Sequence, residues 1–295
     1  MIDKVIKEIP QWQGKKISYT SLSGGITNLN YKVDVDDESF VVCISGAKTS
    51  LLGIDRDQER TINEATAKLG IAPQVVHSTD DGHLVTRFIE GKAFSEEDVR
   101  IEKNIERIAK TIRKFHTLSD FPWKFCSFRM IENYAKTAKD HGAQFPPQFS
   151  QMIEQMNKIE KALSNQPKKL CLCHNDLLSG NFIDDGTIRI IDWEYAGVGD
   201  PFFDTANFST NHVFTNEHDK ILLNHYLGKE PSDTDTAHHN LMKIMSYFRE
   251  AMWAQVQMQI STLDEDFEAY RDKHFDRMSD CIDSEKFEEY LKAVS

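Results

Sequence analysis

The sequence predicts an α+β fold with two lobes, in which a small antiparallel β-rich lobe precedes a larger and mainly helical one. Residues 17 to about 90 show strand patterns interrupted by a single helical pattern, whereas long helical patterns dominate after Gly91. The chain has 295 residues, enough for two lobes that each bury a core. We therefore expect one lobe at residues 1–90 and the other at residues 91–295.

The small lobe is predicted to contain five strands and one helix, with the helix between the third and fourth strands. "NYKVDV" alternates Tyr31, Val33 and Val35 with polar residues, and "FVVCIS" follows the turn "DDES" as a more continuous apolar strand. "RDQERTINEATAKLG" carries apolar residues at helical spacing and ends at Gly70. "APQVVHST" and "HLVTRFI" then predict the last two strands.

The larger lobe is predicted from apolar residues that recur three or four positions apart. Two such stripes are Ile101, Ile105, Ile108, Ile112 and Phe115, and Phe149, Met152, Ile153, Met156 and Ile159. The stretches "DHGAQFPPQF" and "GKEPSDTDTAHH" are the most loop-like, so we expect both at the surface.

The composition limits the classes of partner. Acidic residues outnumber basic ones by 47 to 35, and the net charge of -12 disfavours nucleic acid or an anionic membrane. A cationic substrate would suit this charge, although most acidic proteins have no such ligand. No charge-free window is long enough to cross a bilayer, and the first sixteen residues lack the apolar segment of a secretory signal. We expect no stable membrane insertion and a cytoplasmic location, where the five scattered cysteines stay reduced.

Cys171 and Cys173 lie next to His174, which raises the alternative of a metal site. The two cysteines are separated by one residue in an apolar run, and no second cysteine pair accompanies them. Buried packing is the favoured interpretation, and we assign no zinc there.

The segment "LCHNDLLSGNFI" groups His174, Asp176 and Asn181 within eight positions. Asp192 follows Asp176 by sixteen residues and comes directly after the apolar run "IRII". Between them, "NFIDDGTIRII" predicts a hairpin with "DG" at its turn, which would fold Asp192 back beside Asn181.

This spacing matches what phosphoryl transfer requires. One carboxylate orients the attacking hydroxyl, and oxygen ligands hold magnesium against the phosphates of ATP. Protein kinases use D-x4-N and a second Asp after a strand for these tasks. An HND tripeptide alone is weak evidence, because such acids more often cap helices or turns. No P-loop, dinucleotide-binding or EF-hand motif competes with the kinase interpretation.

These residues resemble the choline and ethanolamine kinases, which share a bilobal protein-kinase-like fold with the aminoglycoside phosphotransferases. The pattern is most similar to that of bacterial choline kinases. It extends over nearly the whole chain, through "LSGGITNLNYKV", "GIDRDQERTIN", "LGIAPQVV", "LVTRFIEG", "HNDLLSGNFI", "IDWEYAGVGDPFFDTANF" and "REAMWAQVQMQISTLDEDFEAY". The resemblance implies ATP and Mg2+ as cofactors and a small cationic amino alcohol as the partner, and a homodimer is compatible with it.

The resemblance also implies roles for the motif residues. Asp176 is the base that positions the substrate hydroxyl, and His174 supports its loop through backbone contacts. Asn181 and Asp192 bind magnesium, and Glu194 assists the metal or the substrate. Chemistry agrees independently, because carboxylate and amide oxygens are the hard ligands that magnesium prefers.

Nucleotide-binding residues are implied in the small lobe. Glu59 matches the family's helix glutamate, which pairs with a basic residue on the preceding strand. A Ser/Gly turn would lie over the phosphates and is formed by Ser23, Gly24, Gly25, Thr27 and Asn28. The lobe connection would lie beside adenine and consists of Phe88, Ile89 and Glu90. Without the downstream motif, the first of these segments would be an ordinary β-turn.

One position departs from the family pattern. The strand "FVVCISG" carries Cys43 where the relatives usually have Arg or Lys. Loss of a fixed positive charge beside the phosphates would weaken transition-state stabilisation. Lys32, Lys48 and Arg56 are candidate substitutes, and a weakened enzyme or a nucleotide-binding pseudokinase stays an alternative.

The acceptor site is inferred from aromatic residues. Tyr195, Trp253 and Tyr270 fall where choline kinases have choline-site aromatics, and Glu250 stands where a tryptophan is expected. Aromatic faces near a carboxylate suit a quaternary ammonium, but aromatics at helical spacing, as around Trp253, are about as often core residues. Glu250 would favour an acceptor with N–H donors, such as ethanolamine.

We therefore expect an ATP- and Mg2+-dependent kinase that phosphorylates the hydroxyl of choline or a related amino alcohol and releases ADP. An aminoglycoside or thiamine kinase of the same fold is the next alternative. Such an enzyme needs a wider acceptor site, whereas the ending "LDEDFEAYRDKHF" resembles the choline-kinase terminus.

Overall fold

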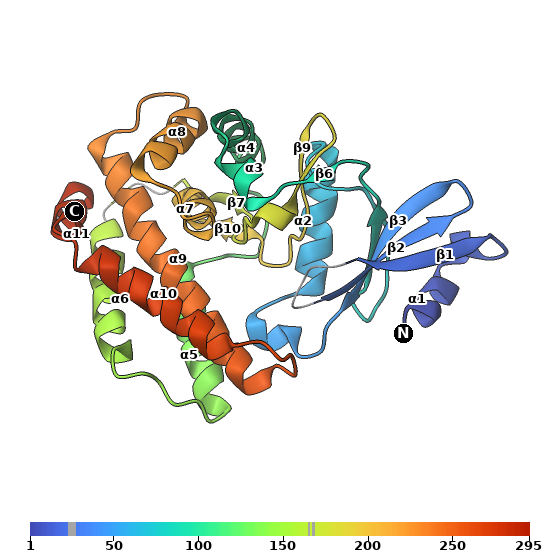
Figure 1. Cartoon of the computed structure of the whole chain (residues 1–295), viewed down its shortest axis with the longest axis horizontal. Coiled ribbons are helices and arrows are strands. Elements are labelled where there is room, and N and C mark those ends of the chain that lie inside the picture. Colours follow the sequence, from blue (N-terminus) through green and yellow to red (C-terminus); the bar gives the residue numbers. More distant parts are fainter. Residues whose placement is uncertain (23–27, 165, 167–168) are drawn as a thin grey trace. The chain divides into compact units, whose positions relative to one another are not determined.

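The computed structural model describes residues 1–295 apart from residues 23–27, 165 and 167–168 (Figure 1). The described residues form two compact units. The first contains Met1–Asp98 and Leu178–Ala196, and the second contains Val99–Leu177 and Gly197–Ser295. The lobe division at residue 90 stays a prediction. The chain enters the first unit twice, because residues 178–196 pack with Met1–Asp98.

The first unit is built on a five-stranded antiparallel sheet, and the second is mainly helical, so the predicted α+β class is confirmed. Helix α2, Arg56–Lys68, lies between the third and fourth strands of the sheet in the chain, as expected. The strands follow the order β1-β2-β3-β5-β4, with bounds Ile17–Leu22, Asn28–Val35, Glu38–Ser45, Leu84–Arg87 and Val75–Ser78 respectively.

Two short helices that the sequence analysis did not predict cover one face of this sheet. They are α1, Ile2–Glu8, and η1, Pro10–Trp12. Their apolar side chains share a core with alternate residues of β2 and β3, among them Val33 and Val42. Because neighbouring strand residues face opposite sides of a sheet, Cys43 lies on the face away from this core.

The rest of the first unit is made of short elements. They are η2 at Thr49–Leu52, β6 at Lys92–Ala93, η3 at Ser179–Asn181, β8 at Phe182–Asp184 and β9 at Ile188–Ile190. Strands β6, β8 and β9 form a second, three-stranded antiparallel sheet. This small sheet connects the 178–196 segment to the earlier part of the unit.

Long helices dominate the second unit. Their bounds are α4 Glu102–Phe115, α5 Ser127–Asp140, α6 Phe149–Leu163, α7 Pro201–Asn211, α8 Asn216–Leu227, α9 Asp233–Ile260, α10 Phe267–Ile282 and α11 Lys286–Val294. Helix α3, Glu96–Arg100, crosses from the first unit into the second, and β7, Cys171–Cys173, pairs with β10, Gly197–Gly199. Helix α9 packs against α5, α7, α10 and α11, and Figure 1 shows α10 lying along it.

Two sequence-based expectations for the helices were partly wrong. Ile101 belongs to the predicted stripe of α4 but is 52% exposed, because it is the N-cap residue and precedes the helix. The predicted surface loop "GKEPSDTDTAHH" ends early, since α9 begins at Asp233. Ser232 and Asp235 form a capping box that starts the helix inside this polar stretch. Within the described ranges, no helix combines the length and the apolar character that a membrane crossing requires.

Candidate active site

The predicted hairpin between Asn181 and Asp192 is present in the first unit. Strands β8 and β9 pair antiparallel, with Phe182 opposite Ile190. The Ile191 N–H donates to the carbonyl of Asn181 over 3.0 Å. The hairpin therefore brings the backbone of Asn181 beside the residue that precedes Asp192, as the turn sequence predicted.

Asn181 and Asp192 have the chemistry of a magnesium site. Asn181 is buried at the end of η3, and Asp192 has a positive φ of 65°, a conformation that Asp tolerates better than most residues. An amide oxygen and a carboxylate are hard oxygen donors of the type that Mg2+ binds. The donor set thus fits the ion, and the two residues could hold it.

Glu194 connects three parts of the first unit. Its Oε2 accepts a hydrogen bond from the Asn28 side chain over 2.9 Å and one from Arg56 over 3.1 Å. Arg56 also pairs with Glu59 over 2.6 Å and donates to Asn28 Oδ1 over 2.8 Å. We call Asn28, Arg56, Glu59 and Glu194 the first cluster. Glu59 therefore pairs with an arginine of its own helix, whereas the family pattern placed its partner on the preceding strand.

The electrostatics of the first cluster follow from burial. Burial raises the pKa of Glu59, and the Arg56 guanidinium opposes that rise. Burial also raises the pKa of the Cys43 thiol, and Glu59, Asp192 and Glu194 raise it further, so the thiol stays neutral beside the cluster. Burial disfavours the charge on Arg56, but Glu59 and Glu194 outweigh burial and raise its pKa. Arg56 therefore stays charged.

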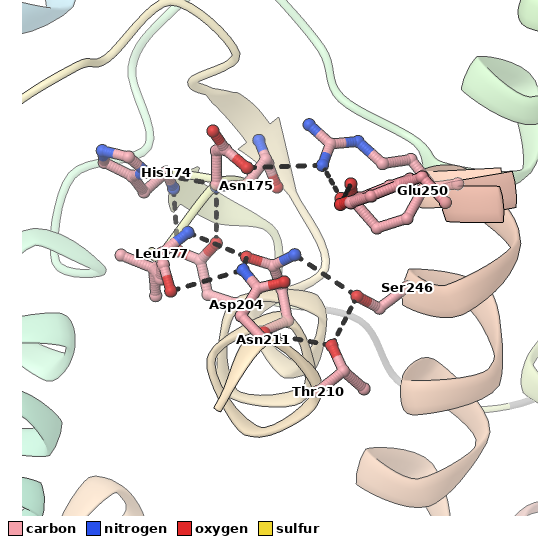
Figure 2. A network of polar contacts seen from close by, with 12 residues as sticks. His174, Asn175, Leu177, Asp204, Thr210, Asn211, Ser246 and Glu250 are labelled. Carbon is pink, nitrogen blue, oxygen red and sulfur yellow. Dashed lines mark hydrogen bonds and ion pairs between the residues drawn. The ribbon is translucent and has the colours of Figure 1, made fainter. Parts of the chain in front are cut away.

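In the second unit, β7 delivers the chain into the loop that carries Asp176. The carboxylate of Asp204 accepts the N–H of His174 over 2.8 Å and the N–H of Asn175 over 2.7 Å, as Figure 2 shows. Asn175 has a positive φ of 67°, and the loop turns sharply there. The Asp176 N–H donates to Nδ1 of His174 over 3.2 Å, which supports a structural role for His174. Helix α7 thus fixes the backbone on which Asp176 is presented.

A polar group lies beneath this loop. The ligand atoms of His116, Cys171 and Cys173 are all buried and lie within 4.8 Å of one another. The neighbouring histidine is thus His116 rather than His174. Its Nδ1 faces the Tyr226 hydroxyl over 2.9 Å, and its Nε2 faces Asp204 over 2.9 Å, so both nitrogens are engaged. We call His116, Cys171 and Asp204 the loop brace.

The loop brace carries charge. Burial lowers the pKa of His116, but its hydrogen bonds with Asp204 and Cys171 outweigh burial and raise it to about 9. The hydrogen bond from Cys173 lowers the pKa of the Cys171 thiol to about 6, against burial and with help from His116. The directions of the two shifts favour a charged His116 imidazole, which pairs with the Asp204 carboxylate, and a charged Cys171 thiol.

Asp176 belongs to a second cluster of charges, formed with Arg249, Glu250 and Tyr270. Nη1 of Arg249 lies 3.4 Å from Oδ1 of Asp176 and also pairs with Glu250. The Tyr270 hydroxyl donates to Oε2 of Glu250 over 3.0 Å. Arg249 and Glu250 are 2% and 7% exposed, so this is a buried network. Burial and the adjacent Glu250 raise the pKa of Tyr270 and keep its hydroxyl protonated.

The predicted acceptor aromatics have different surroundings. Trp253 is buried and makes edge contacts with Phe267 and Tyr270, with ring centroids 5.8 and 5.9 Å apart. Tyr270 is half-buried and lies in the second cluster. Tyr195 is buried in the first unit, one residue after Glu194. The second unit thus brings Trp253 and Tyr270 together beside Glu250, whereas Tyr195 belongs to the first unit.

The predicted adenine segment follows β5. The Phe88 N–H donates to the carbonyl of Ser39 over 3.0 Å, and Nζ of Lys32 lies 4.5 Å from the centre of the Phe88 ring. Ile89 is half-buried and Glu90 is exposed. Of the predicted phosphate turn, Asn28 lies in the first cluster, whereas Ser23, Gly24, Gly25 and Thr27 lie outside the described residues.

Sequence reasoning missed four functional candidates, namely His116, Asp204, Arg249 and the pairing of Arg56 with Glu194. Asp204 stood in the quoted segment "DPFFDTANF", and Arg249 stands beside Glu250. A charged residue within an apolar helical pattern is a usable signal, because burial of an unpaired charge is costly. Their distant partners lie 29 to 138 positions away in the chain, so no local pattern identifies those partners.

Known proteins are similar to this chain over most of its length. The family model described as choline/ethanolamine kinase matches residues 19–279. Human ethanolamine kinase 2 is 27% identical over 302 aligned positions, which cover 90% of this chain and 77% of that protein. The crystal structure of a choline/ethanolamine kinase family protein from Mesorhizobium loti is 28% identical, with a TM-score of 0.86, and covers 99% and 98% of the two chains.

An aminoglycoside 2′-phosphotransferase in its GDP complex is similar in fold alone. It is 15% identical, with a TM-score of 0.66, and 98% of each chain is covered. This likeness is in line with a fold shared between the two groups of kinases.

Proposed function

The chain belongs to the choline/ethanolamine kinase family and is a phosphotransferase with an alcohol group as acceptor, and we propose that its preferred acceptor is a primary amino alcohol such as ethanolamine. ATP is the phosphoryl donor that the family implies. The single observation that carries the acceptor preference is the buried carboxylate of Glu250 in the second cluster.

Glu250 suits an ammonium group that can donate hydrogen bonds. A primary ammonium has three N–H donors, whereas a trimethylated nitrogen has none and depends on aromatic faces. Burial limits the screening of the Glu250 carboxylate by water, so this carboxylate attracts a second cation in addition to Arg249, which it shares with Asp176. The rings of Trp253 and Tyr270 beside it can still cover the apolar part of the acceptor.

The connection between Glu250 and Asp176 supports a common role. Arg249 contacts both carboxylates, so the amine-binding group and the proposed base belong to one network. Ethanolamine has an amine and a hydroxyl two carbons apart, and a compact network can address both ends. A rigid pair of sites also favours small acceptors over large ones.

The proposed reaction assigns each residue a step. Asp176 accepts a hydrogen bond from the acceptor hydroxyl and takes its proton. The acceptor oxygen forms a bond to the γ-phosphorus while the bond to the β–γ bridging oxygen breaks and ADP leaves. Asn181 and Asp192 would hold Mg2+, and Glu194 would keep Asn28 and Arg56 in place. When bound, Mg2+ would neutralise charge on the phosphates. The cytoplasmic location and the homodimer stay predictions.

The test compares ethanolamine with choline as acceptors for the unchanged protein and for Glu250→Gln. We expect the unchanged protein to have the higher kcat/KM with ethanolamine. Glu250→Gln should lower that value at least about tenfold while changing the value for choline less than about threefold, because only the primary ammonium donates to the carboxylate. Glu268→Gln, in an exposed position on α10, is the matched control. Preference for choline, or equal losses for both acceptors, would contradict the proposal.

A further inference from the structure

We propose that Arg56 is the cation that binds the phosphates of the nucleotide in this chain, in place of a basic residue on strand β3. The inference rests on the proposed function, because it takes ATP as the donor. It makes Arg56 a nucleotide-binding residue and not only a partner of Glu59.

The charge balance of the first unit points to a need for this cation. Glu59, Asp192 and Glu194 all act electrostatically on Cys43, and each of them raises its pKa. A polyphosphate that approaches three carboxylates is repelled unless a cation faces it. Strand β3 offers only a neutral thiol there. Among the described residues, Arg56 is the cation that both contacts these glutamates and acts on Cys43.

The geometry of Arg56 leaves donors for a ligand. A guanidinium has five N–H donors. Nη1 contacts Glu59 and Glu194, and Nη2 contacts Asn28. Nε of Arg56 is buried and makes no hydrogen bond within the part of the chain that the structure describes. One N–H on Nη2 is also left after the bond to Asn28. Phosphate oxygens accept pairs of such donors.

Arg56 also contacts Asn28, which the sequence analysis assigned to phosphate binding. Asn28 directly follows residues 23–27, and it exchanges hydrogen bonds with both members of the Arg56–Glu194 pair. Arg56 thus contacts the one described residue among those that the sequence assigned to the phosphates. Glu194, in turn, is two positions beyond Asp192, a proposed ligand of Mg2+.

The side chain of Arg56 is fixed along its length. A methyl group at Gly82 would lie 2.6 Å from Cγ of Arg56, so the β4–β5 turn packs closely on the aliphatic part. The side chain is 14% exposed. A cation held at both ends keeps its position without loss of side-chain entropy when the ligand binds.

The other two sequence candidates have different surroundings. Nζ of Lys32 lies over the Phe88 ring and 3.6 Å from Asp34. Lys48 is exposed in the loop that precedes η2. Arg56 is therefore the candidate that the contacts select.

The experiment moves the positive charge from position 56 to position 43. It compares Arg56→Ala, Arg56→Lys, Cys43→Arg and the double variant Cys43→Arg/Arg56→Ala with the unchanged protein. The Kd for ADP with Mg2+ is measured by calorimetry, the KM values for ATP and acceptor by ADP release, and the fold by circular dichroism. Arg60→Ala, one turn along α2 and at the surface, is the control that leaves the first cluster intact.

We expect Arg56→Ala to raise the Kd for ADP and the KM for ATP at least about tenfold, and the KM for the acceptor less than about threefold. Cys43→Arg/Arg56→Ala should recover at least about a third of the lost affinity, because it returns a guanidinium to the same cluster. If Arg56→Ala does not fold, Arg56→Lys keeps the charge and should show an intermediate loss.

ADP affinity and a KM for ATP within about twofold of the unchanged protein, in a folded Arg56 variant, would overturn the proposal. So would a folded double variant no better than Arg56→Ala. Failure of the proposed function has a different signature, namely no acceptor-dependent turnover by the unchanged protein. The ADP affinities still test Arg56 in that case.

Discussion

The two clusters of this molecule are built alike and are expected to serve ligands of opposite charge. In the first cluster Arg56 lies among Glu59, Glu194 and Asn28, and in the second Arg249 lies between Asp176 and Glu250. A third polar group completes each cluster: the Asn28 amide donates to Glu194 in the first, and the Tyr270 hydroxyl donates to Glu250 in the second.

The difference shows that an arginine–carboxylate pair does not by itself indicate the ligand. The residues around the pair decide which ligand it suits. A neutral thiol beside the first cluster leaves the arginine available to an anion, and aromatic rings beside the second leave a carboxylate suited to a cation. The proposed substrates, an anionic nucleotide and a cationic amino alcohol, match these two environments.

The largest expected effect is on catalysis, at Asp176 in the second cluster and at Asp192, two positions before Glu194 of the first cluster. Asp176→Asn and Asp192→Asn should each lower kcat by about a thousandfold or more, because one removes the proposed base and the other a proposed ligand of Mg2+. Both should keep the unchanged circular dichroism spectrum. Steady-state ADP release measures kcat, and Asp140→Asn, at the exposed end of α5, is the control. Near-normal rates in a folded variant would remove that residue from the proposed mechanism.

The next effect compares the two arginines in folding. Arg249→Ala should lower the free energy of unfolding by on the order of 3–5 kcal/mol, because it leaves Asp176 and Glu250 buried without their cation. Arg56→Ala should lower it by less, about 1–3 kcal/mol, since Arg56 is more exposed and Asn28 still donates to Glu194. Urea unfolding at neutral pH gives both values. The reverse order would mean that the first cluster is the more structural one.

The smallest effect concerns the loop brace. Cys171 and His116 have pKa values of about 6 and about 9 in the folded protein, against ordinary values of 9.0 and 6.5. The pair thus releases its two protons over nearly the same pH range when folded and unfolded, and contributes little pH dependence to stability.

Cys171→Ala should uncover the pH dependence of His116. The raised pKa that Asp204 maintains contributes stability that is fully present below pH 6.5 and is lost as the pH rises through the folded pKa. Between about pH 6 and pH 9 we expect the free energy of unfolding of this variant to fall by on the order of 1–3 kcal/mol more than that of the unchanged protein. Urea unfolding across this range measures the loss, with the exposed Cys126→Ala as control. If the free energy of unfolding depends on pH in the same way in Cys171→Ala and in the unchanged protein, the charged loop brace is refuted.

The sequence predicted what depends on local pattern. The hairpin of β8 and β9 follows from its "DG" turn and alternating residues, and it accounts for the approach of Asn181 and Asp192. The succession of strands along the chain and the position of α2 follow from short-range periodicity, whereas the sequence analysis did not predict the pairing of β3 with β5. The roles of these residues remain proposals.

Contacts between distant segments could not be predicted. Arg56 was one of three candidate cations, and its bonds to Glu194, 138 positions away, and to Asn28 are among the contacts that separate it from Lys32 and Lys48. Asp204 holds a loop about 30 positions earlier, and nothing local to it indicates that partner. The start of α9 could have been found, because Ser232 and Asp235 have the spacing of a capping box.

The most direct test of the central claim is phosphorus NMR of the products formed from ATP, Mg2+ and equal concentrations of ethanolamine and choline. We predict that phosphoethanolamine and ADP accumulate together, ahead of any phosphocholine, and that Asp176→Asn forms neither phosphomonoester. Consumption of ATP without either product, or phosphocholine in excess, would contradict the account of the second cluster as a site for a primary amine.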